Sequence, residues 1–201
     1  IEMFLITEEK FSPIIFREDF TKSSNELNKS EEAFLSWKYA ALDKRLNVVQ
    51  EIRDSLIKNR DKCANIISNE MGKVLSESEA EIDKCVWLCN YYLDNSKIFL
   101  KNRSISTDST SSFIKYDPLG IILGVMPWNF PFWQVFRFAI PTILIGNVVL
   151  LKHAPNVVGC SELINDIFND SSIPENVFNN LVVENKTVEK IIISNCVRGV
   201  S

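Results

Sequence analysis

A polar amide lies in a loop between two apolar segments of this chain. The residues Pro127-Trp128-Asn129-Phe130-Pro131 follow a strand-like run, residues 119–125, and precede a helix-like run, residues 132–145. A buried amide without a partner costs about 1–3 kcal/mol, so an asparagine at this place indicates a use. Its NH2 group could stabilise a negative charge that develops on an oxygen during a reaction. It could instead cap the following helix, and spacing alone favours the cap.

The cysteines are the other candidates for chemistry, but their positions do not form a site. Cys85 and Cys89 lie four residues apart and would share one face of a helix, yet a single histidine, His153, leaves too few ligands for zinc. We therefore expect no metal site. An odd, scattered set of thiols is typical of a protein in the reducing cytoplasm. The five are Cys63, Cys85, Cys89, Cys160 and Cys196.

Apolar strands alternate with helices in the second half of the chain, and this alternation predicts where the candidate residues lie. Strands are expected at 119–125, 148–151, 177–183 and near 197–200, and helices at 132–145, near 161–168 and at 188–193. The pattern is typical of an α/β fold with a parallel sheet covered on both faces. Ligands of such sheets bind beyond the carboxyl ends of the strands. Asn129 and Lys152 both fall at such ends.

The first half of the chain is predicted to be helical. A short strand is expected at residues 3–7, followed by a polar linker through Asn28. Apolar residues then recur at intervals of three and four, which predicts amphipathic helices that pack on one side of the sheet. These helices start at Ser30 and cover about 33–41, 46–56, 61–71 with Gly72 as a stop, and 82–96. Residues 104–116 are rich in serine and threonine and are expected to form a projecting hairpin.

The composition argues against several other classes of protein. The chain has 201 residues, 46% hydrophobic and 24% charged, and its net charge of −4 argues against nucleic-acid binding. Residues 118–136 carry no charge, a length close to the roughly 20 residues that span a bilayer. Prolines and glycines interrupt this stretch, so a lipid-facing helix there would leave backbone groups unpaired. We expect neither a membrane span nor a secretory signal.

Several motifs, in order along the chain, resemble the N-terminal half of the aldehyde dehydrogenases. They are Tyr116-Asp117-Pro118-Leu119-Gly120, residues 126–131, Gly146-Asn147 and Leu150-Leu151-Lys152. Residues 70–73, 87–92, 132–138 and 152–157 are similar to the succinate-semialdehyde dehydrogenase-like branch. The similarity extends from about Ser30 to Val183. It implies an incomplete Rossmann-like NAD(P)-binding domain, residues 1–103 and 117–201, with residues 104–116 as the hairpin of an oligomerisation arm and the catalytic domain absent.

The resemblance implies a catalytic role for Asn129. It would match the family's oxyanion-hole amide, which, with a backbone N–H, holds the oxygen of the thiohemiacetal during hydride transfer. Met126, Pro127 and Trp128 would line the cofactor cleft beside the ribose and the nicotinamide. The cofactor implied is NAD or NADP.

The resemblance also implies an adenosine end of the cofactor site at Lys152, Ala154 and Pro155. Lys152 would match a lysine that hydrogen-bonds the adenosine ribose, whereas without the resemblance a solvated lysine just past a strand would be the favoured interpretation. Many NAD-preferring members carry a glutamate where this chain has Pro155. Without that carboxylate a 2′-phosphate is not repelled, so NADP becomes plausible and the preference stays open.

Arg137 is the candidate for substrate binding. Semialdehyde-oxidising members place an arginine at the matching position, where a guanidinium would bind the remote carboxylate of succinate semialdehyde bidentately. The alternative is an arginine on the helix surface, paired with a neighbouring acid. Trp133, Gln134 and Phe136 are expected either to line the substrate tunnel or to belong to the core.

Two motifs of the family are missing from these residues. The nucleophilic cysteine of a Gly-Gln-x-Cys-type setting and the glutamate base of a Glu-Leu-Gly-Gly-type setting do not occur. None of the five cysteines has the surroundings that a low-pKa thiolate requires. Three interpretations follow: a fragment of a longer enzyme that is inactive alone, one half of a split enzyme, or a non-catalytic nucleotide-binding or interaction module. The complete family enzyme is expected to be a homo-oligomer.

Overall fold

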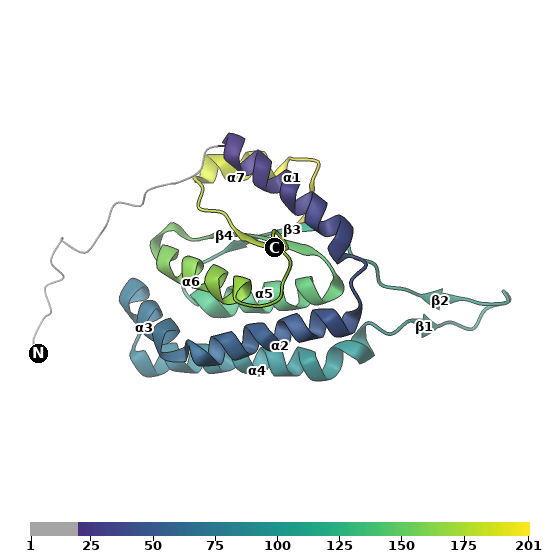
Figure 1. The fold of residues 1–201 in the computed structure, drawn as a ribbon, viewed down its shortest axis with the longest axis horizontal. Helices are drawn as coiled ribbons and strands as arrows, with labels where there is room; N and C mark the ends of the chain where they lie inside the picture. Colours follow the sequence, from purple (N-terminus) through teal and green to yellow (C-terminus); the bar gives the residue numbers. More distant parts are fainter. Residues whose placement is uncertain (1–19) are drawn as a thin grey trace, which may run out of the picture.

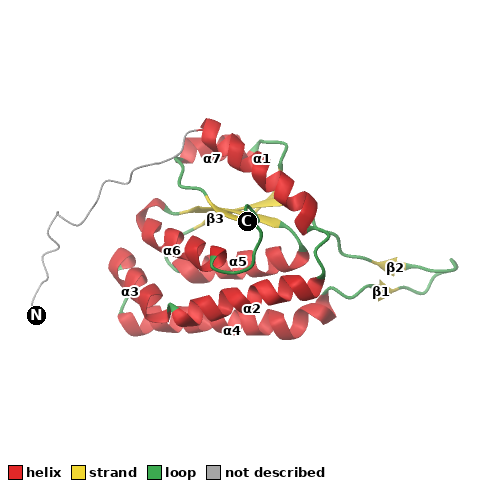
Figure 2. Cartoon of the chain, viewed as in Figure 1, coloured by secondary structure: helices red, strands yellow, loops and turns green. Residues whose placement is uncertain are grey.

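A four-stranded parallel sheet forms the centre of the chain in the computed structural model, which describes residues 20–201 (Figures 1 and 2). The strands are β3 (Ile121–Met126), β4 (Val148–His153), β5 (Phe178–Asn180) and β6 (Val197–Val200). They lie in the order β5-β4-β3-β6, and each neighbouring pair is parallel. In order of sequence this is 3-2-1-4, the order with which a Rossmann sheet begins. The predicted α/β class with a parallel sheet is confirmed, whereas the expected strand at residues 3–7 lies outside the described residues.

Helices cover both faces of the sheet (Figure 1). On one face lie α5 (Pro131–Ile145) and α6 (Val158–Asn169), which follows a 3-10 turn, η2 (Pro155–Val157). Outside them lies a layer of three helices, α2 (Leu42–Lys58), α3 (Arg60–Met71) and α4 (Leu75–Phe99). On the other face lie α1 (Phe20–Trp37) and α7 (Asn185–Ile192).

The first helix corrects two predictions. The expected linker through Asn28 is wrong, because α1 begins at Phe20 and already buries Leu27. The expectation that all N-terminal helices pack on one side is also wrong, because α1 crosses to the opposite face from α2, α3 and α4. The start of α1 is polar, so its sequence carries little of the apolar periodicity that marks the later helices. The helix also ends at Trp37, earlier than the pattern through Ala41 indicated.

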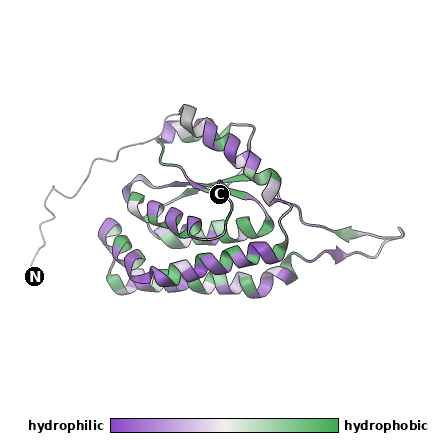
Figure 3. Cartoon of the chain, viewed as in Figure 1, coloured by the Kyte–Doolittle hydropathy of each residue, from purple (hydrophilic) through white to green (hydrophobic). Residues whose placement is uncertain are grey.

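The helix that follows β3 is almost completely apolar, and Figure 3 shows α5 mostly in green beside the more polar α2. Nine of its side chains are buried, since it lies between the sheet and the outer helices. Residues far away in the sequence bind the carbonyl groups at its carboxyl end. Trp37 Nε1 donates to the Ile143 carbonyl at 3.3 Å, and Arg45 Nη1 donates to the Ile145 carbonyl at 3.1 Å. The helix stops at Gly146, whose φ of 104° favours glycine.

The two strands on either side of α5 are joined at their starts by Asn147. Its Oδ1 accepts the N–H groups of Leu119 at 2.7 Å and Gly120 at 3.0 Å. Asn147 is buried, so it supplies the partner that these two backbone groups would otherwise lack. The Gly146-Asn147 pair therefore ends the helix and aligns β3 with β4.

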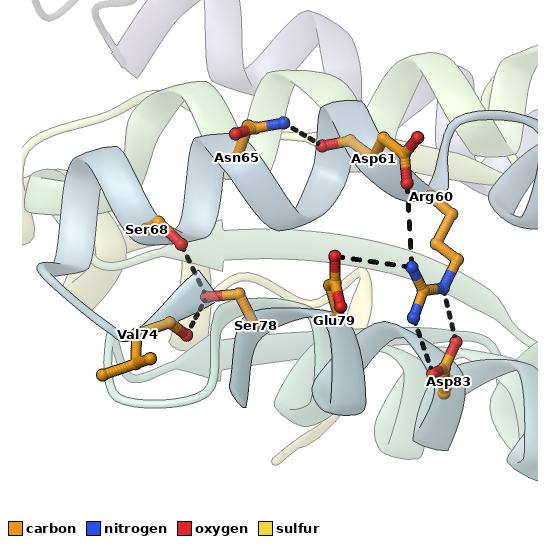
Figure 4. Close-up of polar contacts among 8 residues, drawn as sticks. All are labelled: Arg60, Asp61, Asn65, Ser68, Val74, Ser78, Glu79 and Asp83. Atoms are coloured by element: carbon orange, nitrogen blue, oxygen red, sulfur yellow. Dashed lines mark hydrogen bonds and ion pairs between the residues drawn. The ribbon is translucent and has the colours of Figure 1, made fainter. Parts of the chain in front are cut away.

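Polar contacts fasten α3 to α4 (Figure 4). Arg60 donates to both carboxylate oxygens of Asp83, at 2.7 and 2.9 Å, and this guanidinium lowers the pKa of Asp83. Ser68 Oγ and Ser78 Oγ lie 3.0 Å apart across the same pair of helices. As predicted, α3 stops at Gly72, which has a φ of 73°. The connection between the two helices is therefore well defined, and the site described below depends on it.

The remaining elements largely follow the prediction. The antiparallel strands β1 (Arg103–Ser104) and β2 (Phe113–Ile114) form a hairpin that projects from the body of the molecule (Figure 1). The expected strand at 177–183 shortens to the three residues of β5. Among residues 20–201, no helix combines the length and the hydrophobicity that a membrane span requires.

Candidate active site

The candidate residues meet at one edge of the sheet. In the register of β3 and β4, Met126 lies opposite His153 and Val125 opposite Lys152, so both strands end together. On the other side of β3, the Val125 N–H donates to the Ser201 carbonyl at 2.9 Å, just beyond β6. From β3 the chain continues to β4 and β5 on one side, whereas β6 is added on the other side of β3. The strand order therefore reverses here, which makes this edge the topological switch point where such sheets bind ligands. Asn129 and Lys152 both lie at this edge, as the sequence predicted.

Asn129 itself is exposed, and its side chain makes no hydrogen bond within the part of the chain that the structure describes. The residue at the N-cap position of α5 is Phe130, which has no side-chain cap. The interpretation of Asn129 as a helix cap is therefore wrong. The loop presents a free amide to its surroundings, beside Trp128 and Phe130, which are both exposed.

The cap of α5 comes from another helix. Glu81, on α4, accepts the N–H groups of Phe132 at 2.9 Å and Trp133 at 3.0 Å, both through Oε1. A carboxylate is the charge that a helix N-terminus stabilises, and hydrogen bonds to a charged acceptor are the strong ones. The side chain of Glu81 is only 1% exposed. The N-terminal end of α5 is therefore fixed to α4.

Lys73 neutralises this buried carboxylate. Its Nζ donates to the second oxygen of Glu81, Oε2, at 2.7 Å, and its side chain is 7% exposed. The same ammonium lies 3.9 Å from the centre of the Phe130 ring, a cation–π contact with the residue that follows Asn129. The Lys73–Glu81 pair therefore contacts the chain immediately after Asn129 at three residues.

His153 holds the same turn from the sheet. Its Nδ1 accepts the N–H of Ala154 at 2.8 Å, so the proton of the neutral ring is on Nε2, which donates to the Pro131 carbonyl at 2.9 Å. Burial lowers the pKa of His153, the largest cause, against smaller opposing effects such as the Pro131 carbonyl. The imidazole is thus kept neutral in the tautomer that joins β4 to the start of α5.

The lowered pKa of His153 is expected to make the free energy of unfolding depend on pH. The folded-state pKa lies below the ordinary value of 6.5, so the unfolded chain binds a proton first as the pH falls. The contribution of His153 to the free energy of unfolding is fully present above about pH 6.5. It is lost as the pH falls from there toward the folded-state pKa, with a slope of up to about 1.4 kcal/mol per pH unit. Urea unfolding of the chain between pH 7.5 and 5.5 measures this, and His153→Gln is expected to flatten the profile. Equal slopes in both proteins would contradict the assignment.

Lys152 lies inside β4 and is buried, so the interpretation as a solvated lysine past the strand is wrong. Its Nζ donates to the His153 carbonyl at 2.7 Å, and burial lowers the pKa of Lys152. Together with Ala154 and Pro155 it lines a hollow whose other wall is the segment after β5. Asn180 lines the hollow as well, and its buried Oδ1 has no hydrogen-bond partner among the described residues.

Arg137 lies on the exposed side of α5 and donates to Gln134 Oε1 at 2.9 Å through Nη2. Arg137 therefore lies on the helix surface, as the alternative expected, but its partner is an amide and not an acid. Trp133 is partly buried and carries the Lys84 ammonium at 4.0 Å from its ring centre, whereas Phe136 is completely buried in the core. Two cationic side chains therefore border the same part of α5.

The cysteines are all free, and the structure gives none of them the surroundings of a nucleophile. Cys63, Cys85, Cys89 and Cys160 are buried. Burial raises the pKa of Cys63 and of Cys89 to about 12 and that of Cys85 and Cys160 as well. Cys196 is half-buried, and burial and its hydrogen bond to Glu31 raise its pKa. A thiol with a raised pKa is a poor nucleophile at neutral pH.

The start of α6 has a cap of the same kind as α5. Glu70, on α3, accepts the Gly159 N–H at 2.7 Å through Oε1 and the Cys160 N–H at 2.8 Å through Oε2. Free N–H groups at a helix N-terminus are a common anion site, but at α5 and α6 internal carboxylates already occupy them. These four N–H groups are therefore not free to bind an anion.

Sequence reasoning quoted Glu70-Met71-Gly72-Lys73 as a motif but assigned no role to its two charged residues. It missed Glu81, and it noted His153 without a function. The spacing signals used for helices and strands act over a few residues, whereas Glu81 lies 51 positions from the N–H it accepts. The sequence did contain one signal for these roles: an acid, Glu70, and a lysine, Lys73, stand close to Gly72, where α3 has to end.

A parallel sheet that starts in the order 3-2-1-4, with helices on both faces and its polar groups at the switch point, places the chain in the Rossmann class of α/β domains. The sequence matches the aldehyde dehydrogenase family over residues 2–201, and the chain belongs to this family.

Individual relatives agree with this. The chain is 41% identical over 166 residues to a probable succinate-semialdehyde dehydrogenase [NADP(+)] of Synechocystis sp., a match that covers 83% of this chain and 37% of the relative. It is 39% identical over 168 residues to the succinate semialdehyde dehydrogenase [NAD(P)+] Sad of Escherichia coli K12, covering 84% and 36%. The chain thus spans little more than a third of these relatives.

Solved structures show the same architecture. The succinic semialdehyde dehydrogenase of Streptococcus pyogenes in complex with NADP+ superposes with a TM-score of 0.87 at 27% identity, over 95% of this chain and 41% of that one. The structure of Gox0499 gives a TM-score of 0.89 at 30% identity, over 91% and 40%. The predicted membership of the aldehyde dehydrogenases, in a partial Rossmann-like form, is confirmed.

Proposed function

We propose that this chain is the N-terminal part of an NAD(P)-dependent aldehyde dehydrogenase that oxidises succinate semialdehyde, or a similar aldehyde, to the carboxylic acid. The observation that carries the proposal is the exposed amide of Asn129, without a partner of its own in the described chain and held at the switch point by a loop that is anchored on two sides. The names of the Synechocystis and E. coli relatives support the substrate.

In this function Asn129 would donate its NH2 hydrogens to the aldehyde oxygen as that oxygen becomes negatively charged. The amide does not move a proton; it stabilises charge, and it is preorganised because the turn after it is fixed. The cofactor, when bound, accepts the hydride. Met126, Pro127 and Trp128, in the same loop, would border the nicotinamide side.

The hollow beside β4 is proposed to lie at the adenosine end of such a cofactor and to offer polar partners to it. Lys152 Nζ uses one donor on the His153 carbonyl, so two donors remain for hydroxyl oxygens. The unpaired Oδ1 of Asn180 is an acceptor that a hydroxyl or an amino group of a ligand could satisfy. Pro155 lines the hollow without a carboxylate, so we propose that NADP is accepted alongside NAD.

Calorimetric titration of NADP+ and NAD+ into the purified chain tests cofactor binding. We expect heat of binding for at least one of them at millimolar concentration, and weaker binding in Lys152→Met. The absence of heat with both cofactors would overturn the proposed cofactor site.

Alone, residues 1–201 are expected to bind the cofactor without turnover, because no cysteine of the chain is an activated thiol. Joining these residues to the segment of the Synechocystis relative that follows the matched region, here called the joined enzyme, is expected to give oxidation of succinate semialdehyde. NAD(P)H formation followed by absorbance measures both. Turnover by the chain alone would contradict this part of the proposal. Activity on simple mixing of two separate polypeptides would favour a split enzyme.

Arg137 is expected to determine the substrate selectivity of the joined enzyme. Arg137→Ala is expected to raise the KM for succinate semialdehyde by about tenfold or more, since a charge-assisted hydrogen bond contributes about 1.5–3 kcal/mol. The KM for butanal, which has the same chain length without the carboxylate, is expected to change little. Steady-state kinetics with both aldehydes decides: equal effects would remove Arg137 as the carboxylate anchor.

Two further parts of the proposal concern assembly and compartment. The hairpin of β1 and β2 is proposed to act as an oligomerisation arm, since it extends away from the rest of the molecule in Figure 1. The five free thiols favour a reducing compartment, the cytoplasm.

A further inference from the structure

The turn after Asn129 is held by three side chains, one from α4, one from β4 and one from the connection between α3 and α4. Glu81 of α4 binds the N–H groups of Phe132 and Trp133, His153 of β4 binds the Pro131 carbonyl, and Lys73 lies over the Phe130 ring. Every residue from 130 to 133 therefore has a fixed partner outside the loop.

Asn129, in contrast, has no side-chain partner in the described chain that would aim it. A catalytic group has to be held within about 0.5 Å of its working position by the residues around it. The orientation of the Asn129 amide must therefore come from the backbone that follows it, and that backbone is fixed to α4 through Glu81.

We propose that Glu81 is a positioning residue for Asn129, and that Lys73 is the counter-ion that allows a carboxylate to be buried there. The inference rests on the proposed function only for what Asn129 does; the order of the loop is measurable without any substrate or cofactor. Glu81 would act through the loop and would not touch the aldehyde.

The geometry distinguishes this role from ordinary capping. A helix that needs only a cap takes it from a serine, threonine, aspartate or asparagine at its own N-cap, and α5 has Phe130 there. Glu81 instead reaches from a separate helix and binds two successive N–H groups with one oxygen. It therefore sets the position of the first turn of α5 relative to α4, which a local cap does not do.

Two double variants of equal charge separate the hydrogen-bond acceptor from the fold. Lys73→Met/Glu81→Leu removes the pair and the acceptor, while Lys73→Met/Glu81→Gln removes the pair but keeps an acceptor oxygen. Replacement of a buried ion pair by apolar residues of similar volume is often neutral for stability, so both variants are expected to remain folded. The Glu81→Leu variant leaves the Phe132 and Trp133 N–H groups without their acceptor, so it is expected to have the lower melting temperature of the two.

The measurement is 15N relaxation of the backbone N–H groups of Trp128, Asn129 and Phe130 in the purified chain. In the wild type and in the Glu81→Gln double variant we expect order parameters of about 0.85, typical of a rigid backbone. In the Glu81→Leu double variant we expect values below about 0.6 at these residues. The side-chain NH2 signals of Asn129 should shift in the same variant.

Glu70 provides the matched control, since it caps α6 with the same chemistry from the neighbouring helix α3. Glu70→Leu is expected to loosen residues 156–159 and to leave residues 128–130 rigid. Equal order parameters at 128–130 in the two double variants would overturn the proposal. Loss of the folded spectrum in either double variant would also overturn it, because the pair would then hold the fold and not the loop.

Discussion

Replacing Asn129 by alanine is expected to lower the kcat of the joined enzyme by about 10²–10³, the loss typical of removing one oxyanion-hole donor. The melting temperature is expected to stay unchanged, because the side chain is exposed and makes no hydrogen bond among residues 20–201. Steady-state kinetics with succinate semialdehyde and thermal unfolding of the same preparation measure the two effects.

Asn147 is the control for this prediction, since it is the same residue type in a structural role. Its buried Oδ1 accepts two backbone N–H groups, so Asn147→Ala leaves two donors unpaired at about 1–3 kcal/mol each. We expect it to lower the melting temperature clearly. A fall in stability on Asn129→Ala, or an unchanged kcat, would show that the exposed amide is not used as proposed.

Lys73→Met is expected to lower the free energy of unfolding by about 3–5 kcal/mol, the effect of removing one partner of a buried ion pair. The lysine neutralises a carboxylate that is almost completely shielded from water. With the ammonium gone, the charge of Glu81 is uncompensated apart from two backbone N–H groups. Urea unfolding of the chain, followed by circular dichroism, measures the loss.

The second substitution is expected to restore most of this stability. Lys73→Met/Glu81→Gln removes the uncompensated charge and keeps an acceptor oxygen for the Phe132 and Trp133 N–H groups, so its free energy of unfolding should lie close to that of the wild type. Arg60→Gln, which breaks the exposed bidentate pair with Asp83 in Figure 4, is expected to have a much smaller effect than Lys73→Met. A single variant as stable as the wild type would mean that Lys73 is not needed to bury Glu81.

The elements that could be predicted from the sequence are those in which one physical requirement dominates. A strand covered on both faces must be apolar throughout, which is why β3 and β4 were found within two residues of their bounds. Gly72 marked the end of α3 because the left-handed backbone conformation at a helix end favours glycine. At the edge of the sheet the same reasoning gave too long a strand: Val177, Leu181 and Val183 are buried as predicted, but only residues 178–180 pair as β5.

The residues of the site also divide into those that could be predicted from the sequence and those that could not. Asn129 and Lys152 could be placed because each lies a few residues from a strand end that the sequence marks. Glu81 could not, because its partners, Phe132 and Trp133, come from another helix, and local spacing contains no information on such a pairing. The roles of Pro155 and Arg137 stay predictions, which the titrations and kinetics above test.

The hydrogen bond from Trp37 to the Ile143 carbonyl joins residues 106 positions apart, and this has a consequence for how the chain folds. The first helix cannot form this contact until α5 has been synthesised. Trp37 therefore lacks this partner until 106 further residues have been added to the growing chain. Contacts of such long sequence separation slow folding, because the loop between them must close before they form. We therefore expect the three-helix layer of α2, α3 and α4, whose contacts are local, to form first and to be the platform on which the sheet assembles.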